Sequence, residues 1–183
     1  MKRWLTILLN LVAYDVCWTV AMFGAGRPWW WAGPVVITLS TVGQLLLGPN
    51  AARLGAVILA GSTVGVLGDL LASRIGLFTF NGDQSQFVLV FLALWVNFGT
   101  TLTPTLRFLW RRPFAAALLG AIGGPAAYWL GDRIGTIALA DSGVAALVWC
   151  SMQYATIIPL WMLIAARCLP AEAAPVSEPG AKR

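Results

Sequence analysis

The side chains best suited to chemistry in this chain are single polar residues set within long apolar stretches. Asp15 and Asp69 each stand alone in such a stretch, and Asn97 and Gln153 lie near the centres of two others. A carboxyl or amide in apolar surroundings can bind a polar ligand, exchange a proton or hydrogen-bond to a neighbouring helix. If the stretches form a helical bundle, the geometry allows Asp15, Asn97 and Gln153 to form an inward-facing cluster, with Tyr14 beside Asp15. Hydrogen bonds between helices are the structural alternative for Asn97 and Gln153.

Asp69 has basic residues within reach on two of these stretches. Arg74 follows it five residues later, and Arg133 lies in a later stretch beside Tyr128 and Asp132. These residues are expected at similar depth. An ion pair with Arg74 or Arg133 is therefore the structural alternative to a functional role for Asp69.

Several kinds of site are excluded by what the chain lacks. It contains no His, which removes His-ligated metals and any Ser-His or Cys-His nucleophile pair. Its three Cys residues, Cys17, Cys150 and Cys168, are too far apart in sequence to suggest a metal or redox motif. We therefore expect no metal site, no cofactor and no catalytic residue set of a known type.

Composition places the polar residues in a membrane protein. Apolar residues make up 59% of the 183 residues and charged residues only 10%, whereas soluble domains carry about 25% charged residues. The ten Trp residues agree, because Trp is enriched at membrane–water interfaces. The sequence predicts a polytopic integral membrane protein and excludes a soluble or disordered chain.

Charged residues divide the chain into six apolar segments, each near the length of about 20 residues that a membrane-crossing helix needs. We predict an all-α membrane helix bundle that forms one transmembrane domain over residues 1–169. Residues 170–183 are rich in Ala, Pro and Glu and are expected to form a disordered cytoplasmic tail. The predicted spans are residues 4–26, 29–48, 54–76, 86–108, 114–132 and 143–166.

Basic residues predict the orientation of the bundle. Nine of the 12 Lys and Arg residues fall on the side of the two termini and three on the other, and cytoplasmic loops carry such an excess. Both termini are therefore predicted in the cytoplasm. The basic residues lie mostly in short loops, so we expect no nucleic-acid partner. Arg107, Arg111 and Arg112 are expected to contact anionic lipid headgroups.

The third and fifth spans resemble each other at an offset of 59 residues, either through an internal repeat or through chance in a biased composition. Small residues four apart let helices approach closely in lipid, so these two spans are expected at the packed centre of the bundle. Pro125 is expected to kink the fifth span and free a carbonyl. The matches are Gly61 with Gly120, Gly65 with Gly124, and residues 74–76 with 133–135.

Short motifs from the first span to the sixth carry a family resemblance. They are residues 10–12 with Trp18, 68–71, 94–95, 100–102, 106–109, 112–113 and 120–128. Together they resemble a family of small bacterial inner-membrane proteins known only as domain of unknown function 2878. The most specific part is the Gly-Gly-Pro-x-x-Tyr run at 123–128.

The resemblance implies a place in the bacterial cytoplasmic membrane. Members of that family are often encoded near fatty-acid-modifying genes such as cyclopropane synthases, which implies a link to lipid metabolism by association. The family often has an amide at the position of Asp15, which implies a smaller role for this carboxyl. Trp18, Asp69, Arg107 and Tyr128 match the family's pattern.

We expect this protein to bind or move a lipid or another amphiphile, with membrane lipids as partners. One alternative is an accessory or structural subunit of a lipid-modifying system, which would pair with a membrane enzyme or a second copy. The other is a lipid- or isoprenoid-modifying enzyme that uses Asp69 or Asp15 as acid or base. The candidate ligand-binding residues are Asp15, Trp18, Asp69, Trp95, Asn97, Arg107, Tyr128 and Gln153.

Overall fold

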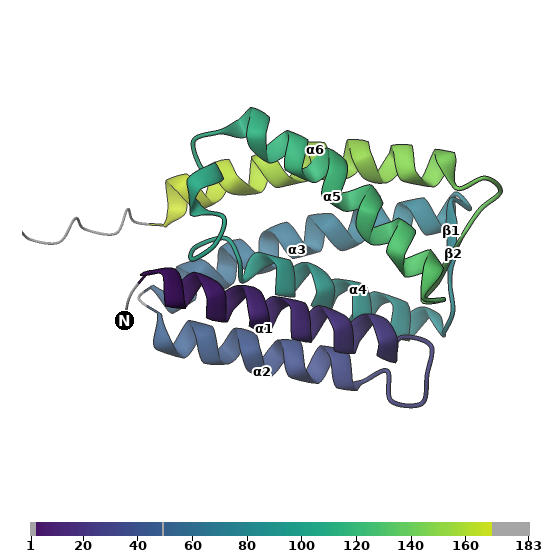
Figure 1. Cartoon of the computed structure of the whole chain (residues 1–183), viewed down its shortest axis with the longest axis horizontal. Coiled ribbons are helices and arrows are strands. Elements are labelled where there is room, and N and C mark those ends of the chain that lie inside the picture. Colours follow the sequence, from purple (N-terminus) through teal and green to yellow (C-terminus); the bar gives the residue numbers. More distant parts are fainter. Residues whose placement is uncertain (1–2, 49, 170–183) are drawn as a thin grey trace, which may run out of the picture.

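Six helices and two very short strands make up the part of the chain that the computed structural model describes, residues 3–48 and 50–169 (Figure 1). The fold is all-α, as predicted, and the expected tail at 170–183 lies outside the described residues. In order, the elements are α1 (Arg3–Gly24), α2 (Ala32–Leu47), α3 (Ala51–Arg74), β1 (Phe78–Phe80), α4 (Gln84–Gly99), the 3-10 turn η1 (Arg107–Leu109), α5 (Pro113–Arg133), β2 (Ile137–Leu139) and α6 (Val144–Cys168).

Four of these helices are long and apolar enough to cross a membrane. They are α1, α3, α5 and α6, with 21 to 25 residues in the apolar part of each. The apolar helices α2 and α4 have 16 residues each. At 1.5 Å per residue they fall short of a hydrocarbon core of about 30 Å.

The helix predicted over residues 86–108 is shorter in the structure, where α4 ends at Gly99. The Thr100 and Thr101 hydroxyls donate to the carbonyls of Asn97 (2.7 Å) and Phe98 (2.6 Å), so they compete with the next backbone N–H groups. Pro104 then lacks an N–H and cannot continue a helix. The chain turns instead and reaches η1.

The helices form an elongated bundle with α1 and α2 on one side, α5 and α6 on the other, and α3 and α4 between them (Figure 1). The first turn of α1 and the last turn of α6 lie at the same end of the bundle. The paired strands β1 and β2 lie at the opposite end, where Thr136 ties β2 to α1 by donating to the Met22 carbonyl at 2.7 Å.

Further correspondences at the 59-residue offset, which favour a repeat over chance, occur in the backbone that joins each long helix to its strand. Gly76 after α3 and Gly135 after α5 both have positive φ, +80° and +78°, which glycine adopts without strain. The strands pair antiparallel about Thr79 and Ala138, which are themselves 59 residues apart in sequence. The turn hydrogen bonds Gly76 N–H to Ser73 and Gly135 N–H to Asp132 also correspond, each at 3.1 Å.

The glycines of α3 and α5 permit close packing, as predicted, but α5 lies on one side of the bundle and not at its centre (Figure 1). A Cβ on Gly61 would lie 2.1 Å from the Trp161 ring, and one on Gly65 would lie 2.2 Å from the Trp95 ring. A Cβ on Gly120 would lie 2.3 Å from the Tyr154 carbonyl oxygen. The small-residue face of α3 therefore receives α4 and α6, and that of α5 receives α6. Among the described residues α3 and α5 do not pack along each other.

Pro125 leaves a helix carbonyl without its usual partner, as predicted. The carbonyl four residues earlier, that of Ala121, has no N–H to accept from Pro125. The Ser151 hydroxyl of α6 donates to this carbonyl at 2.9 Å. One polar group on α6 thus satisfies the defect in α5 and joins the two helices.

Candidate functional site

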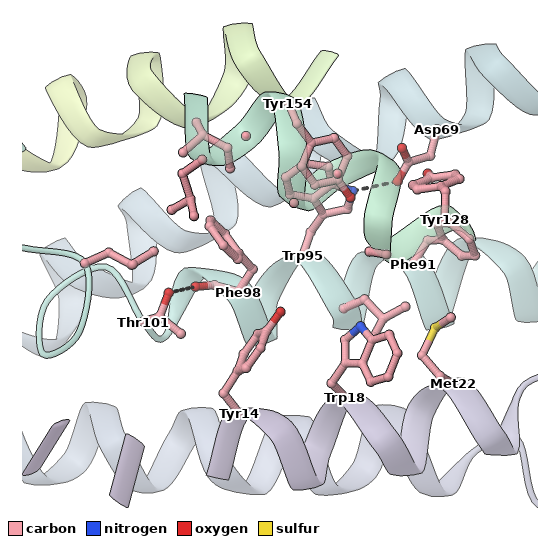
Figure 2. Close-up of a pocket in the computed structure, with 18 of the residues that line it drawn as sticks. Tyr14, Trp18, Met22, Asp69, Phe91, Trp95, Phe98, Thr101, Tyr128 and Tyr154 are labelled. Carbon is pink, nitrogen blue, oxygen red and sulfur yellow. Dashed lines mark hydrogen bonds between the residues drawn. The ribbon is translucent and has the colours of Figure 1, made fainter. Parts of the chain in front are cut away.

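A cavity of about 270 Å³ runs along the bundle between α1, α4 and α5 (Figure 2). Its volume is near the lower end for small-molecule sites. Met22 and Ile137 line it towards the strand end, and Thr105 and Leu106 line it towards the opposite end. We call this cavity the pocket.

The α5 wall of the pocket is hollow because its side chains are small. Gly120, Gly123, Gly124 and Ala127 recur on one helix face at the spacing that aligns residues along a helix. A Cβ on Gly123 would meet no atom within 4 Å, so the space in front of this residue is open.

The pocket opens sideways, between α1 and α5. These two helices form opposite walls, and no run of contacts joins them among the described residues. Leu11 on α1 and Leu119 on α5 line the pocket and are 38% and 43% exposed. An apolar molecule can therefore reach the pocket from the side of the bundle.

The deepest polar group in the pocket is the Asp69 carboxyl of α3, which is 1% exposed. Its Oδ2 accepts from Trp95 Nε1 at 2.6 Å, and its Oδ1 accepts from Gln153 Nε2 at 2.8 Å. Gln153 in turn accepts from Trp149 Nε1 at 2.8 Å and donates to the Gly65 carbonyl at 3.1 Å. We call these four side chains, Asp69, Trp95, Gln153 and Trp149, the Asp69 network.

Glycines on α3 make room for this network. Trp95 lies over Gly65, one helical turn from Asp69, and its indole N–H reaches the carboxyl from there. Gln153 lies against Gly68, where a Cβ would come within 2.6 Å of its amide nitrogen. Larger residues at either glycine would push the donors away from Asp69.

The repeat relates the main residues of the pocket to one another. Asp69 and Tyr128 differ by 59 in number, as do Trp95 and Tyr154. Trp95 lies over Gly65, and Tyr154 lies over Gly124 in the same way. The two aromatic rings meet in the pocket with centroids 4.6 Å apart.

All three tyrosines of the chain, Tyr14, Tyr128 and Tyr154, line the pocket. Figure 2 shows Tyr14 and Trp18 pointing from α1 towards the wall that carries Trp95 and Tyr128. The Tyr128 hydroxyl is buried near the Asp69 carboxyl without meeting hydrogen-bond geometry. Tyr14, Trp18 and Tyr154 also make no side-chain hydrogen bond to a described residue.

The structure brings together four of the eight predicted ligand-binding residues: Trp18, Asp69, Trp95 and Tyr128 line the pocket. A fifth, Gln153, does not line it but hydrogen-bonds to Asp69.

The predicted inward cluster of Asp15, Asn97 and Gln153 does not form. Asp15 is exposed on α1 and makes no hydrogen bond to a described residue. It lies at the edge of the helix face that Leu11 and Trp18 present to the pocket, so its carboxyl is not directed inward. Asn97 is buried and donates to the Tyr14 carbonyl at 3.0 Å, so it joins α4 to α1.

Arg107 does not join Asp69 and Tyr128. It lines a separate hollow with Arg111 and Arg112, beside the end of α6. Its guanidinium lies 5.2 Å from the Trp110 ring centroid. This second hollow begins next to Leu106, where the pocket ends.

The alternative of an ion pair between Asp69 and Arg74 or Arg133 is not observed among the described residues. Asp69 is occupied by Trp95 and Gln153. Asp132 accepts the Leu139 N–H at 3.0 Å, and the Arg133 guanidinium lies 5.2 Å from the Trp129 ring centroid. The short strands draw Asp132 to the backbone instead.

Several pocket residues were not predicted as ligand-binding, chiefly Tyr14, Tyr154, Phe91 and Phe98. One signal was present in the sequence. Tyr is favoured at membrane interfaces, yet all three tyrosines fall within the apolar stretches. Their convergence depends on which spans are neighbours, which the sequence does not state.

Comparison with known proteins identifies a family but no function. Residues 7–160 match the family described as "Protein of unknown function (DUF2878)". No curated protein and no solved structure matches the chain significantly.

Proposed function

We propose that this chain, which belongs to the DUF2878 family, is an integral membrane protein whose pocket binds, or moves, a lipid or another amphiphile. The observation that carries the proposal is the pocket itself, an apolar cavity with a sideways opening between α1 and α5. In a membrane such an opening faces lipid chains, so hydrophobic ligands enter without passing through water.

The composition of the pocket supports an amphiphile over a fully polar solute. Most of its lining is aromatic or aliphatic, with a few polar groups near Asp69. Sites of this kind use the apolar surface for affinity and the few polar groups for orientation. A ligand larger than the cavity would leave part of its chain between α1 and α5, in contact with the bilayer.

We further propose that all six helices cross a bacterial cytoplasmic membrane, with both termini in the cytoplasm. The nine-to-three distribution of basic residues supports this orientation. The position of the first turn of α1 and the last turn of α6 at one end of the bundle is consistent with an even number of crossings. The 16-residue helices α2 and α4 then rely on the adjoining turns to complete their spans.

Native mass spectrometry of the protein extracted in a mild detergent tests the proposed function. We expect one retained lipid class, which fragmentation identifies. Gly123→Leu should abolish retention, because it fills the open space in the pocket wall. Gly43→Leu in α2 is the matched control, since a Cβ there also meets nothing within 4 Å and the residue lies outside the pocket.

Two results would contradict the proposal. One is a bare protein with no retained lipid. The other is a lipid retained equally by the Gly123→Leu and Gly43→Leu variants, which would place it on the outer surface. A stoichiometric partner protein without lipid would instead favour an accessory subunit.

A further inference from the structure

The hydrogen-bonding groups of the pocket identify the chemistry of the ligand that it would select. We infer that the pocket prefers long-chain molecules with an uncharged oxygen group, such as a hydroxyl or a carbonyl, over the corresponding anions. The inference rests on the proposed function, and it adds which amphiphiles the site distinguishes.

The first argument is the supply of donors. The hydroxyls of Tyr14 and Tyr154 and the indole N–H of Trp18 belong to pocket-lining residues and make no hydrogen bond to a described residue. The Tyr128 hydroxyl is fully buried beside the Asp69 carboxyl and is not counted among these donors. Buried donors without partners are costly, so a ligand oxygen that accepts from them is favoured.

The second argument is the charge around these donors. The described lining contains no Lys or Arg, and its one acidic side chain is Asp69. A carboxylate, phosphate or sulfonate placed among the tyrosines would lie near this carboxyl without a balancing cation, at a depth where charge is expensive. Neutral oxygens avoid that cost.

The third argument concerns cations. Both carboxyl oxygens of Asp69 already accept short hydrogen bonds from Trp95 and Gln153. An ammonium group would have to compete with these donors, and phenolic hydroxyls nearby give it no further negative charge. The pocket therefore favours a neutral group over a cation as well.

The position of the polar groups also orients the ligand. Tyr14 and Trp18 extend from α1 towards Trp95, Tyr128 and Tyr154 (Figure 2). The pocket towards its other end is lined mainly by apolar side chains, including Leu11, Phe98, Leu106 and Leu119. The ligand's oxygen group would lie among the tyrosines, and its chain would follow the apolar end and the opening between α1 and α5.

Photolabelling of the purified full-length protein in detergent tests this inference. The probes are four 16-carbon chains with a diazirine at the same carbon: an alcohol, an alkane, a sulfonate and a quaternary ammonium. We expect the alcohol to label peptides of α1, α4 and α5 about tenfold more than the other three probes, as two hydrogen bonds would allow.

Variants separate hydrogen bonding from packing. Tyr14→Phe and Tyr154→Phe remove one hydroxyl each and should lower alcohol labelling several-fold while leaving alkane labelling unchanged. Thr38→Val is the matched control, because the Thr38 hydroxyl lies on the exposed side of α2 and bonds to the Pro34 carbonyl of its own helix. Thermal unfolding establishes that each variant remains folded.

The outcomes distinguish the inference from the proposed function. Equal pocket labelling by all four probes, or a preference for the sulfonate or the ammonium, would overturn the inference and leave ligand binding standing. So would an alcohol preference that survives both Tyr→Phe changes. Failure of every probe to label the pocket would contradict the proposed function itself.

Discussion

Asp69 is a buried carboxyl that holds side chains from two other helices. Trp95 of α4 and Gln153 of α6 both donate to it, so one residue of α3 organises the wall of the pocket. Asp15, an acidic residue near the middle of α1, is exposed and makes no hydrogen bond to a described residue. Two carboxyls that look alike in the sequence therefore have different environments.

We predict that Asp69→Ala lowers the free energy of unfolding by about 1–3 kcal/mol, because the Trp95 and Gln153 donors lose their acceptor. Asp15→Ala should change it by less than about 0.5 kcal/mol. Unfolding of both variants in mixed micelles measures the difference. Equal stability of the two variants would show that the Asp69 network does not stabilise the fold.

The sequence predicted Asp69, Trp18, Trp95 and Tyr128 as ligand-binding residues, and all four line the pocket. It failed for Asp15 because depth in a span says nothing about direction around the helix. The 59-residue offset already related Asp69 to Tyr128, since it places both on matching faces of α3 and α5.

At the scale of the elements, glycine determines how closely the helices approach. We predict that Gly65→Ala destabilises the protein by about 1–3 kcal/mol, since its Cβ would overlap the Trp95 ring. Gly43→Ala places the same methyl group in open space and should be neutral or slightly stabilising. Parallel denaturation of the two variants checks this, and a harmless Gly65→Ala would contradict the packing.

A second prediction concerns Pro125 and Ser151. Ser151→Ala should cost about 1 kcal/mol in the wild-type protein, because the Ala121 carbonyl loses its donor. In a Pro125→Ala background the helix supplies its own N–H to that carbonyl, so the same change should cost much less. A double-mutant cycle measures the coupling. Additive effects would mean that Ser151 does not compensate for Pro125.

Element boundaries were predictable only where hydropathy changes. The long helices α1, α3, α5 and α6 begin and end within three residues of the predicted spans. The end of α4 was missed because no charged residue occurs between Gly99 and Arg107, while threonines and Pro104 end the helix. The strands β1 and β2 were missed because three residues are too few for a recognisable alternation.

At the scale of the whole molecule, the proposed topology makes a prediction about access from the two sides of the membrane. Cys168, exposed at the end of α6, should react with an impermeant maleimide only after cells are opened. A Ser142→Cys variant, exposed between β2 and α6, should react in intact cells. Cys17 and Cys150 are buried and should stay unlabelled. If both positions were labelled from the same side of the membrane, α6, the helix between them, could not cross it.

Composition and charge were sufficient to predict a membrane helix bundle, because apolar length and loop charge are properties of the chain alone. The pocket was not predictable in that way. It depends on α1 and α5 standing apart, so that Tyr14 and Trp18 of α1 point across open space to the wall that carries Trp95 and Tyr128.

The most direct test of the pocket as a ligand site is photocrosslinking in living cells from two adjacent residues. Leu119 lines the pocket, whereas Leu118 does not line it and is 63% exposed. With p-benzoylphenylalanine at 119, we predict adducts enriched in one amphiphile class, and at 118 adducts that follow the bulk lipid composition. Identical adduct profiles at the two positions would contradict a ligand site in the pocket.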